Sequence, residues 1–268
     1  TLNTELFDIG TLLTIPTLET AGFDVVLTGE GLNFDQLNVA ATGQLSNLSY
    51  RGYIYDNVAL EGKLSSEKFQ GLMSIYDTAL DLDLEGEIDF ASDIRNFSFT
   101  SDIKQADFAA LGWIPKSIEG NFSGSVDLAL QGNTIDEMIG DLYIEQGKLQ
   151  TPDKTYFFSS LAAQSRLTNN IRVLNISSED VATGLIIGEF KPTELHKLIK
   201  NALGTQFSNY AAEEITSNQY VDFNFNLRGK IASALFGEDV ILDDNTFVNG
   251  KIRPYDEPVS YTHLTLPT

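Results

Sequence analysis

Cysteine is absent from this chain of 268 residues, and histidine and tryptophan are nearly so, with two and one residues. Without cysteine there is no disulfide, no thiol nucleophile and no thiolate metal site. Basic residues are also few: 17 lysines and arginines stand against 38 aspartates and glutamates, a formal net charge of -21. Such a protein repels nucleic acid and anionic lipid headgroups. We therefore exclude nucleic acid as a partner and expect any lipid contact to be apolar and sheltered.

Long apolar runs and catalytic motifs are missing as well. The sequence contains no run of about 18 apolar residues, the length that a membrane-spanning helix requires. It also contains no P-loop, G-x-S-x-G or H-E-x-x-H motif. His196 has no neighbouring histidine or cysteine, so we predict a partly exposed residue without a metal or acid-base role. The acidic stretch 81–87 begins like a calcium-binding EF-hand loop, but Ser92 stands where the bidentate glutamate is required. We predict no enzyme, no cofactor and no metal site.

The strongest positive signal is a period of two. From Leu80 to Phe90, apolar and acidic residues alternate, and Gly86 alone interrupts the apolar phase. Neighbouring residues of a strand point to opposite faces, so this segment has one apolar face and one charged face. Residues 126–130 and 221–227 alternate in the same way. Together with 42% hydrophobic residues, which is enough for a core, the pattern predicts an all-β fold.

Glycine recurs inside these strands in the pattern apolar-x-Gly-x-apolar. A glycine at an in-phase position suits a bend, a bulge or a close approach of two backbones. Recurrence at irregular spacing favours a stacked, quasi-one-dimensional sheet over a closed sandwich. A sandwich in which glycine simply ends ordinary strands is the alternative. The pattern is found at residues 60–64, 84–88, 118–122, 227–231 and 248–252.

Signals for helix are few. Residues 192–203 are predicted to form one short amphipathic helix, with Pro192 in the first turn and Gly204 as the stop. Single turns are predicted at 106–111 and 134–139. The last ten residues, VSYTHLTLPT, resemble the translation of a sequencing adapter. We therefore divide the chain into a partial β domain, residues 1–258, expected to be truncated at both ends, and a non-native tail, residues 259–268.

The order of these motifs resembles the TamB/AsmA-like family of envelope proteins. Residues 103–112, IKQADFAALG, look like the family's strand followed by a D-L-x-x-L-G turn, with Phe108 where leucine is usual. Residues 128–142, LALQGNTIDEMIGDL, are similar to a passage that recurs in the family. Residues 184–195, GLIIGEFKPTEL, resemble a strand that runs into a short helix. The resemblance covers about residues 20 to 255.

The resemblance implies an elongated, curved sheet, taco-like in section, with an apolar inner face. It further implies a periplasmic protein of the Gram-negative envelope, anchored in the inner membrane by an N-terminal helix that this fragment lacks. The implied partners are phospholipid acyl chains and an Omp85-type barrel in the outer membrane, reached through a C-terminal region that is also absent. The implied roles are phospholipid transport between the two membranes and support of outer-membrane protein assembly.

We predict that the apolar phase of the strands lines the groove. The alternatives are a dry core against a second sheet, a scaffold or adhesin module that binds protein strands without lipid, and a β-helical glycan hydrolase. The last is the weakest, because it needs paired carboxylates in a cleft with aromatic platforms. The predicted lining residues are Leu80, Leu82, Leu84, Ile88, Phe97, Phe99, Val126, Leu128, Leu130, Val221, Phe223, Phe225 and Leu227.

Overall fold

The computed structural model describes most of the chain and shows it as β-strands joined by short turns. No helix of seven or more residues is present in the part that it describes. The predicted all-β fold is therefore confirmed. The described residues are 1–8, 10–11, 18–31, 38–65, 67–113, 120–195, 197–198, 201, 214–215, 219–229, 243, 245–253 and 263–265.

The chain divides into two compact units. Unit 1 consists of Thr1–Ala129 and Ile144–Phe157, and unit 2 of Leu130–Tyr143 and Phe158–Thr268. Strands β10, β11 and β12 therefore contribute residues to both units. The strands are β1 (Leu2–Asp8), β2 (Thr20–Glu30), β3 (Asn38–Ser46), β4 (Leu48–Tyr50), β5 (Tyr53–Tyr55), β6 (Val58–Ser65), β7 (Lys68–Tyr76), β8 (Leu80–Asp89), β9 (Asn96–Ala106), β10 (Asn121–Gln131), β11 (Ile139–Gln150), β12 (Thr155–Thr168), β13 (Ile171–Ser177), β14 (Ala182–Glu189), β15 (Tyr220–Leu227), β16 (Thr246–Ile252) and β17 (His263–Thr265).

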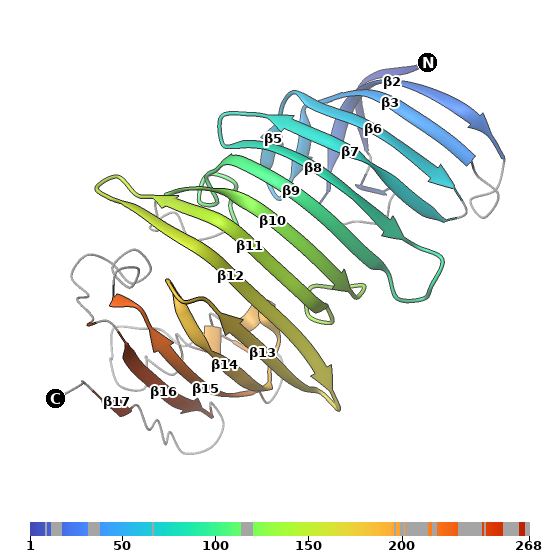
Figure 1. Ribbon diagram of the computed structural model, residues 1–268. Coiled ribbons are helices and arrows are strands. Elements are labelled where there is room, and N and C mark those ends of the chain that lie inside the picture. The colour runs from blue at the N-terminus through green and yellow to red at the C-terminus, as the bar shows by residue number, and fades with distance from the viewer. Residues whose placement is uncertain are drawn as a thin grey trace. The chain divides into compact units, whose positions relative to one another are not determined.

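Within each unit the strands are antiparallel and follow one another almost in sequence order. Unit 1 has the order β1-β2-β3-β6-β7-β8-β9-β10-β11, and β4 and β5 form a separate hairpin. Unit 2 has the order β12-β13-β14-β15-β16-β17. Figure 1 shows the strands of each unit side by side, and the strand order does not close on itself. A meander of this kind needs only short connections, because each strand pairs with the next one along the chain.

The alternation in the sequence is carried from strand to strand by the register. Leu84 of β8 lies opposite Met73 of β7 and Ser101 of β9, whereas Asp83 lies opposite Ser74 and Asp102. A slip of one residue would move every apolar side chain of a strand to the charged face. The register therefore keeps the two faces of β7, β8 and β9 chemically distinct.

The packed core of unit 1 lies at one end of its strands, beneath the β4–β5 hairpin and the turn after β9. In this turn Asp107 accepts the backbone N–H of Ala110 at 2.9 Å through its carboxylate, and the N–H of Leu111 at 3.0 Å through its carbonyl. The predicted turn at 106–111 is thus present as a hydrogen-bonded turn. Leu111 in this turn and Val58 at the start of β6 are both fully buried.

A carboxylate fixes the hairpin to the same strand ends. Asp77, just after β7, accepts the N–H of Asp56 at 3.2 Å and of Ala79 at 3.1 Å, and the hydroxyl of Tyr53 donates to it. Tyr55 follows on the same hairpin and is only 3% exposed. Burial raises the pKa of its hydroxyl to about 12, so Tyr55 stays neutral. The hairpin therefore closes this end of the sheet with aromatic rings and a fixed carboxylate.

The helix predicted at 192–203 is not confirmed. The structure has a short 3-10 turn, Pro192–Glu194, and helical backbone at Leu195 and Leu198. His196 and most residues beyond 198 lie outside the described part of the chain. The side chains of Leu195 and Leu198 pack against Val221 and Ile252 of the sheet. Leu195 and Leu198, which the predicted helix would carry on its apolar side, thus pack on the sheet, although no helix of the predicted length is established.

Replacing Leu111 by alanine should destabilise unit 1, because it removes a fully buried side chain and leaves a cavity under the turn. We expect a loss of about 2–5 kcal/mol in the free energy of unfolding, measured by urea denaturation. Leu72→Ala is the matched control, since Leu72 is 48% exposed, and should cost less than about 1 kcal/mol. Equal losses in both variants would mean that the turn does not close the core.

Candidate functional site

The register aligns apolar side chains of successive strands into rows that cross the sheet of unit 1. In one row Phe69 of β7 faces Ile88 of β8, which in turn faces Phe97 of β9. Parallel rows at two-residue intervals place the same phase of every strand on one side. We call this side the unit 1 apolar face. Its three central rows are Val39-Leu64-Phe69-Ile88-Phe97, Ala41-Gly62-Gly71-Gly86-Phe99 and Gly43-Leu60-Met73-Leu84-Ser101.

Burial divides the predicted lining residues of β8 into two groups. Leu80 and Leu82 are 3% and 8% exposed and belong to the closed core beneath the hairpin. Leu84 and Ile88, further along the same strand, are only partly buried. Contact with a mobile ligand requires accessible surface. Leu84 and Ile88 are therefore candidates for ligand contact, whereas Leu80 and Leu82 have the surroundings of core residues.

The other predicted residues of unit 1 are likewise only partly buried. Phe97 and Phe99 lie on β9 with ring centroids 6.5 Å apart. Ser98 and Thr100, which alternate with them and point to the opposite side, are exposed. Val126 and Leu128 are partly buried on β10, where the alternation of burial is equally regular. These side chains share the phase that the sequence predicted.

Unit 2 has an apolar face of its own. Phe223 of β15 lies opposite Ile186 of β14 and Gly250 of β16, and Phe225 lies opposite Gly184 and Val248. We call this side the unit 2 apolar face. Val221, at one end of it, is 2% exposed and packs with Phe190, Leu198 and Ile252 in a closed core. Phe223, Phe225, Leu227 and Leu130 are partly buried.

A buried arginine holds a loop beside the unit 2 apolar face. Arg172 of β13 is 2% exposed, and its guanidinium donates to the carbonyl oxygen of Met138 at 2.6 Å, to that of Asp136 and to the hydroxyl of Ser165. The carboxylate of Asp136 in turn accepts the backbone N–H of Thr193 at 3.1 Å. One charged side chain thereby joins the turn before β11 to β13, and Asp136 joins the same turn to the 3-10 turn. The single turn predicted at 134–139 is present here, with Met138 N–H bonded to the Thr134 carbonyl.

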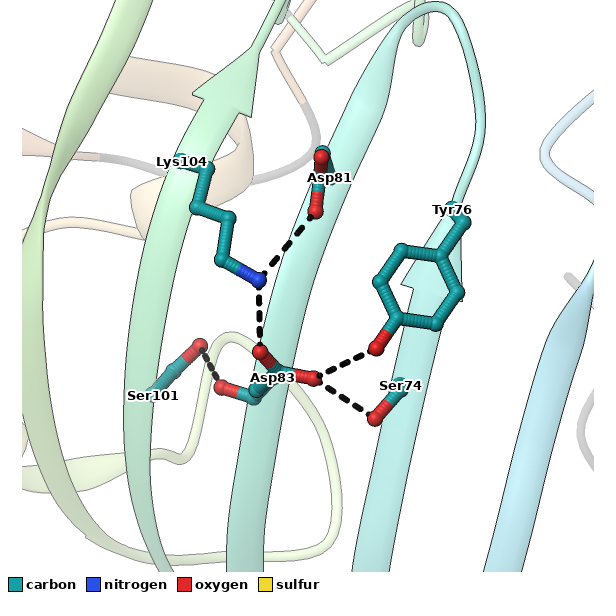
Figure 2. A network of polar contacts seen from close by, with 6 residues as sticks. All are labelled: Ser74, Tyr76, Asp81, Asp83, Ser101 and Lys104. Atoms are coloured by element: carbon teal, nitrogen blue, oxygen red, sulfur yellow. Dashed lines mark hydrogen bonds and ion pairs between the residues drawn. The ribbon is translucent and has the colours of Figure 1, made fainter.

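The opposite side of unit 1 is polar and carries an ion-pair network (Figure 2). The ammonium of Lys104 lies 2.7 Å from Asp83 and 3.8 Å from Asp81. Asp83 also accepts the hydroxyl of Ser74 at 2.6 Å and that of Tyr76 at 3.3 Å. The hydrogen bond from Lys104 holds the pKa of Asp83 below its ordinary value of 3.8, and Ser74 adds to the effect. The acidic phase of β8 is thus a hydrated face with cross-strand partners.

A hollow of about 790 Å³ opens on this polar side, above the backbone of Gly62, Gly71 and Gly86. Glu87 at its edge is already paired with Lys68 at 2.8 Å and with Gln70 at 2.8 Å. Its other polar walls include Glu61, Lys63, Glu85 and Thr100. No group of three histidine, cysteine or carboxylate residues suited to a metal ion is found in the part of the chain that the structure describes. We assign this hollow no ligand.

Some residues of the unit 1 apolar face were missed by the sequence prediction, chiefly on β6 and β7. On β7 the signal was present, since Phe69, Gly71, Met73 and Ile75 alternate. Leu72 obscured it, because this leucine lies on the polar side and is 48% exposed. If Gly71 is counted as a residue of the apolar phase, the alternation extends through the whole of β7.

Comparison with known proteins gave no relationship: no protein-family model matches the sequence, and no curated protein or solved structure is significantly similar to it. Among the described residues, none of the helices has the length and apolar character to cross a membrane. We therefore infer a function from the two apolar faces and their chemistry.

Replacing Arg172 by methionine should loosen the turn around Met138. The substitution removes the guanidinium donor from two partly buried carbonyl oxygens and a hydroxyl, which we expect to cost about 2–4 kcal/mol, measured by urea denaturation. The rate of hydrogen exchange at the backbone amides of residues 132–138 should also rise in this variant. Arg166→Met is the matched control: Arg166 bonds to Gly140 and Asp141, but its side chain is 53% exposed, so we expect less than about 1 kcal/mol. The two variants behaving alike would contradict an anchoring role for Arg172.

The lowered pKa of Asp83 predicts a pH-dependent contribution to stability. A carboxyl whose pKa is lower in the folded than in the unfolded state stabilises fully above its unfolded value and loses this effect as the pH falls through its folded value. The melting temperature of the wild type should exceed that of Asp83→Asn at pH 7, and the gap should shrink below about pH 3.8. Thermal melts at pH 7 and pH 3 test this. A gap that stays constant or widens in acid would show that the charge of Asp83 is not responsible.

Proposed function

We propose that this chain is a segment of an envelope protein whose β-sheet provides an apolar surface for phospholipid acyl chains, and that it performs no covalent chemistry. The observation that supports the proposal best is the combination of register and burial on the unit 1 apolar face. Apolar rows cross strands β3 to β9, and Leu84, Ile88 and Phe97 keep part of their surface accessible. A side chain in a closed sandwich core would lose nearly all of its exposure.

Energetics favour such a surface as a path for lipid. Moving one CH₂ group into water costs about 0.8 kcal/mol, so a palmitoyl chain faces roughly 12 kcal/mol on leaving a membrane unaided. An apolar face removes most of this barrier. Apolar contacts are non-directional, so the acyl chain can shift from one row of side chains to the next without breaking a specific bond.

The backbone at several glycines supports a sheet that curves toward its apolar side. A Cβ atom at Gly86 would lie 2.2 Å from the carbonyl oxygen of Ser98, and one at Gly43 would lie 2.2 Å from that of Asp24. Distances this short mean that the neighbouring backbone approaches closely on the side where the missing side chain would stand. We propose that this local bending is part of an elongated, taco-like sheet with the apolar face inside.

The setting is also part of the proposal. We propose a periplasmic location in the Gram-negative envelope, with an anchor in the inner membrane and an Omp85-type barrel of the outer membrane as the partner. The proposed roles are phospholipid transport between the two membranes and support of outer-membrane protein assembly. The net charge of -21 is consistent with contact through acyl chains, because anionic headgroups are repelled by the acidic side.

Site-specific photo-crosslinking tests the proposal in cells. A photoreactive amino acid at Leu84, on the apolar face, should give adducts with phospholipid that mass spectrometry identifies. The matched control is Glu85, the next residue, which points to the polar side and is exposed. Lipid adducts at Leu84 and not at Glu85 would support the proposal. Absence of lipid at Leu84, or equal labelling at both positions, would refute it.

A second candidate function is a scaffold that binds strands of another protein. Strand β1 is at the edge of unit 1 and pairs only with β2 among the described strands. Its Leu2 and Leu6 are 50% and 65% exposed. Edge strands with free hydrogen-bonding groups are places where an extended peptide can add to a sheet. In the same crosslinking experiment, this function predicts protein adducts at Leu6 and no lipid at Leu84.

A further inference from the structure

A short segment of unit 2 lies against the sheet without being one of its strands. It consists of residues 190–195 and 197–198, follows β14 and contains the 3-10 turn; we call it the strap. Its Phe190 and Leu198 are 6% and 0% exposed. Both belong to a buried cluster that also contains residues of β15 and β16, and Leu195 packs against this cluster. The strap thus contacts the sheet through its apolar side chains.

The strap covers one end of the unit 2 apolar face. In the covered row, Val221 pairs with Gly188 on one side and with Ile252 on the other. Val221 and Ile252 are the two sheet residues of the buried cluster, and Val221 is 2% exposed. Phe223, two residues further along β15 in the same phase, packs against the cluster but is only partly buried. The covered row therefore continues a face that is more accessible beyond the strap.

Two polar contacts hold the strap in place, and they differ in exposure. The amide of Gln219, which is 3% exposed, accepts the backbone N–H of Lys191 at 2.7 Å and donates to the carboxylate of Glu194. In the second contact, which is exposed, the carboxylate of Asp136 accepts the N–H of Thr193 at 3.1 Å and its hydroxyl at 2.8 Å. Water can replace an exposed hydrogen bond at little net cost. The Asp136–Thr193 contact is therefore the attachment that opens more easily.

We infer that the strap is an autoinhibitory cover of the unit 2 apolar face, and that opening its polar contact with Asp136 admits an acyl chain to the covered row. This inference rests on the proposed function. The exchange is close to balanced, because an acyl chain offers Val221 and Ile252 the same non-directional apolar contacts as the leucines that leave. Release also returns the carboxylate of Glu194, which is 8% exposed, to water, and burial of a carboxylate opposes the closed state. Lipid then binds this row with an affinity scaled by the fraction of molecules whose strap is open.

Labelling of the whole chain with a fatty acid that carries a diazirine in its acyl chain tests the inference. After irradiation, peptide mass spectrometry compares the label in β15 with the label in β8, where the partly buried Leu84 belongs to the unit 1 apolar face. Asp136→Ala should raise the ratio of β15 label to β8 label about fivefold, because it removes the acceptor of Thr193 and leaves the apolar residues of the strap unchanged. Glu137→Ala is the matched control. Glu137 is an exposed residue of the same turn, so this variant should keep the wild-type ratio.

A crosslink separates an opened strap from a damaged fold. The chain has no cysteine, so Asp136→Cys together with Thr193→Cys introduces the only two thiols. With both thiols free, the ratio of β15 label to β8 label should rise about fivefold, as in Asp136→Ala. Joining the thiols with a short bis-maleimide should return the ratio to the wild-type value, because the strap is then held closed in the same double variant.

The outcomes distinguish the two proposals. Absence of label from β8 in the wild type would refute the proposed function and this inference with it. Three results would overturn the inference alone while β8 is labelled: an unchanged ratio in Asp136→Ala, an equal rise in Glu137→Ala, or a ratio in the double variant that the bis-maleimide does not lower.

Discussion

The separation of apolar and charged side chains onto opposite sides of each strand is the constraint on which the rest of this structure depends. It is a property of the pleat, since successive residues point to opposite sides. It becomes a property of the units because the register places Leu84 opposite Met73 and Asp83 opposite Ser74. The closed strand ends and the central glycine row belong to the apolar side, and the ion pairs belong to the charged side.

Each unit closes its apolar face at one end and leaves the remainder less buried. In unit 1, Val58, Leu82 and Leu111 are all buried, and the β4–β5 hairpin is hydrogen-bonded to Asp77 at the end of β7. In unit 2 the residues after Pro192 bury Val221 and Ile252. Polar anchors hold both covers: Asp77 in the first, and in the second Gln219, which accepts the N–H of Lys191 at 2.7 Å. Buried polar groups with satisfied hydrogen bonds favour a single arrangement of such covers over many alternatives.

The two-faced strands could be predicted because period two is a local property of the sequence. The sequence could not predict which residues of the apolar phase are buried. Leu82 and Leu84 are identical in type and phase, yet Leu82 is 8% exposed and Leu84 is only partly buried, a difference that the alternation within β8 does not contain. Phe69 was missed for a related reason: Leu72 hides the alternation of β7, and its position on the polar side follows from the register. The acidic residues of β8 lie on the charged face that their alternation predicts, but the pairing of Asp81 and Asp83 with Lys104 depends on the neighbouring strand β9.

The high negative charge and the apolar faces are physically coupled. An open antiparallel sheet with a partly exposed apolar side is prone to stack with copies of itself, and its edges are prone to pair. Charge on the opposite side and across the molecule opposes both, because association brings like charges together. The ion pairs of Lys104 with Asp83 and of Lys68 with Glu87 reduce repulsion between adjacent strands, yet 17 basic residues cannot balance 38 acidic ones. A sheet of this kind therefore retains a repulsive exterior while its apolar side stays accessible to an uncharged, flexible chain. The proposed lipid-binding face requires this combination.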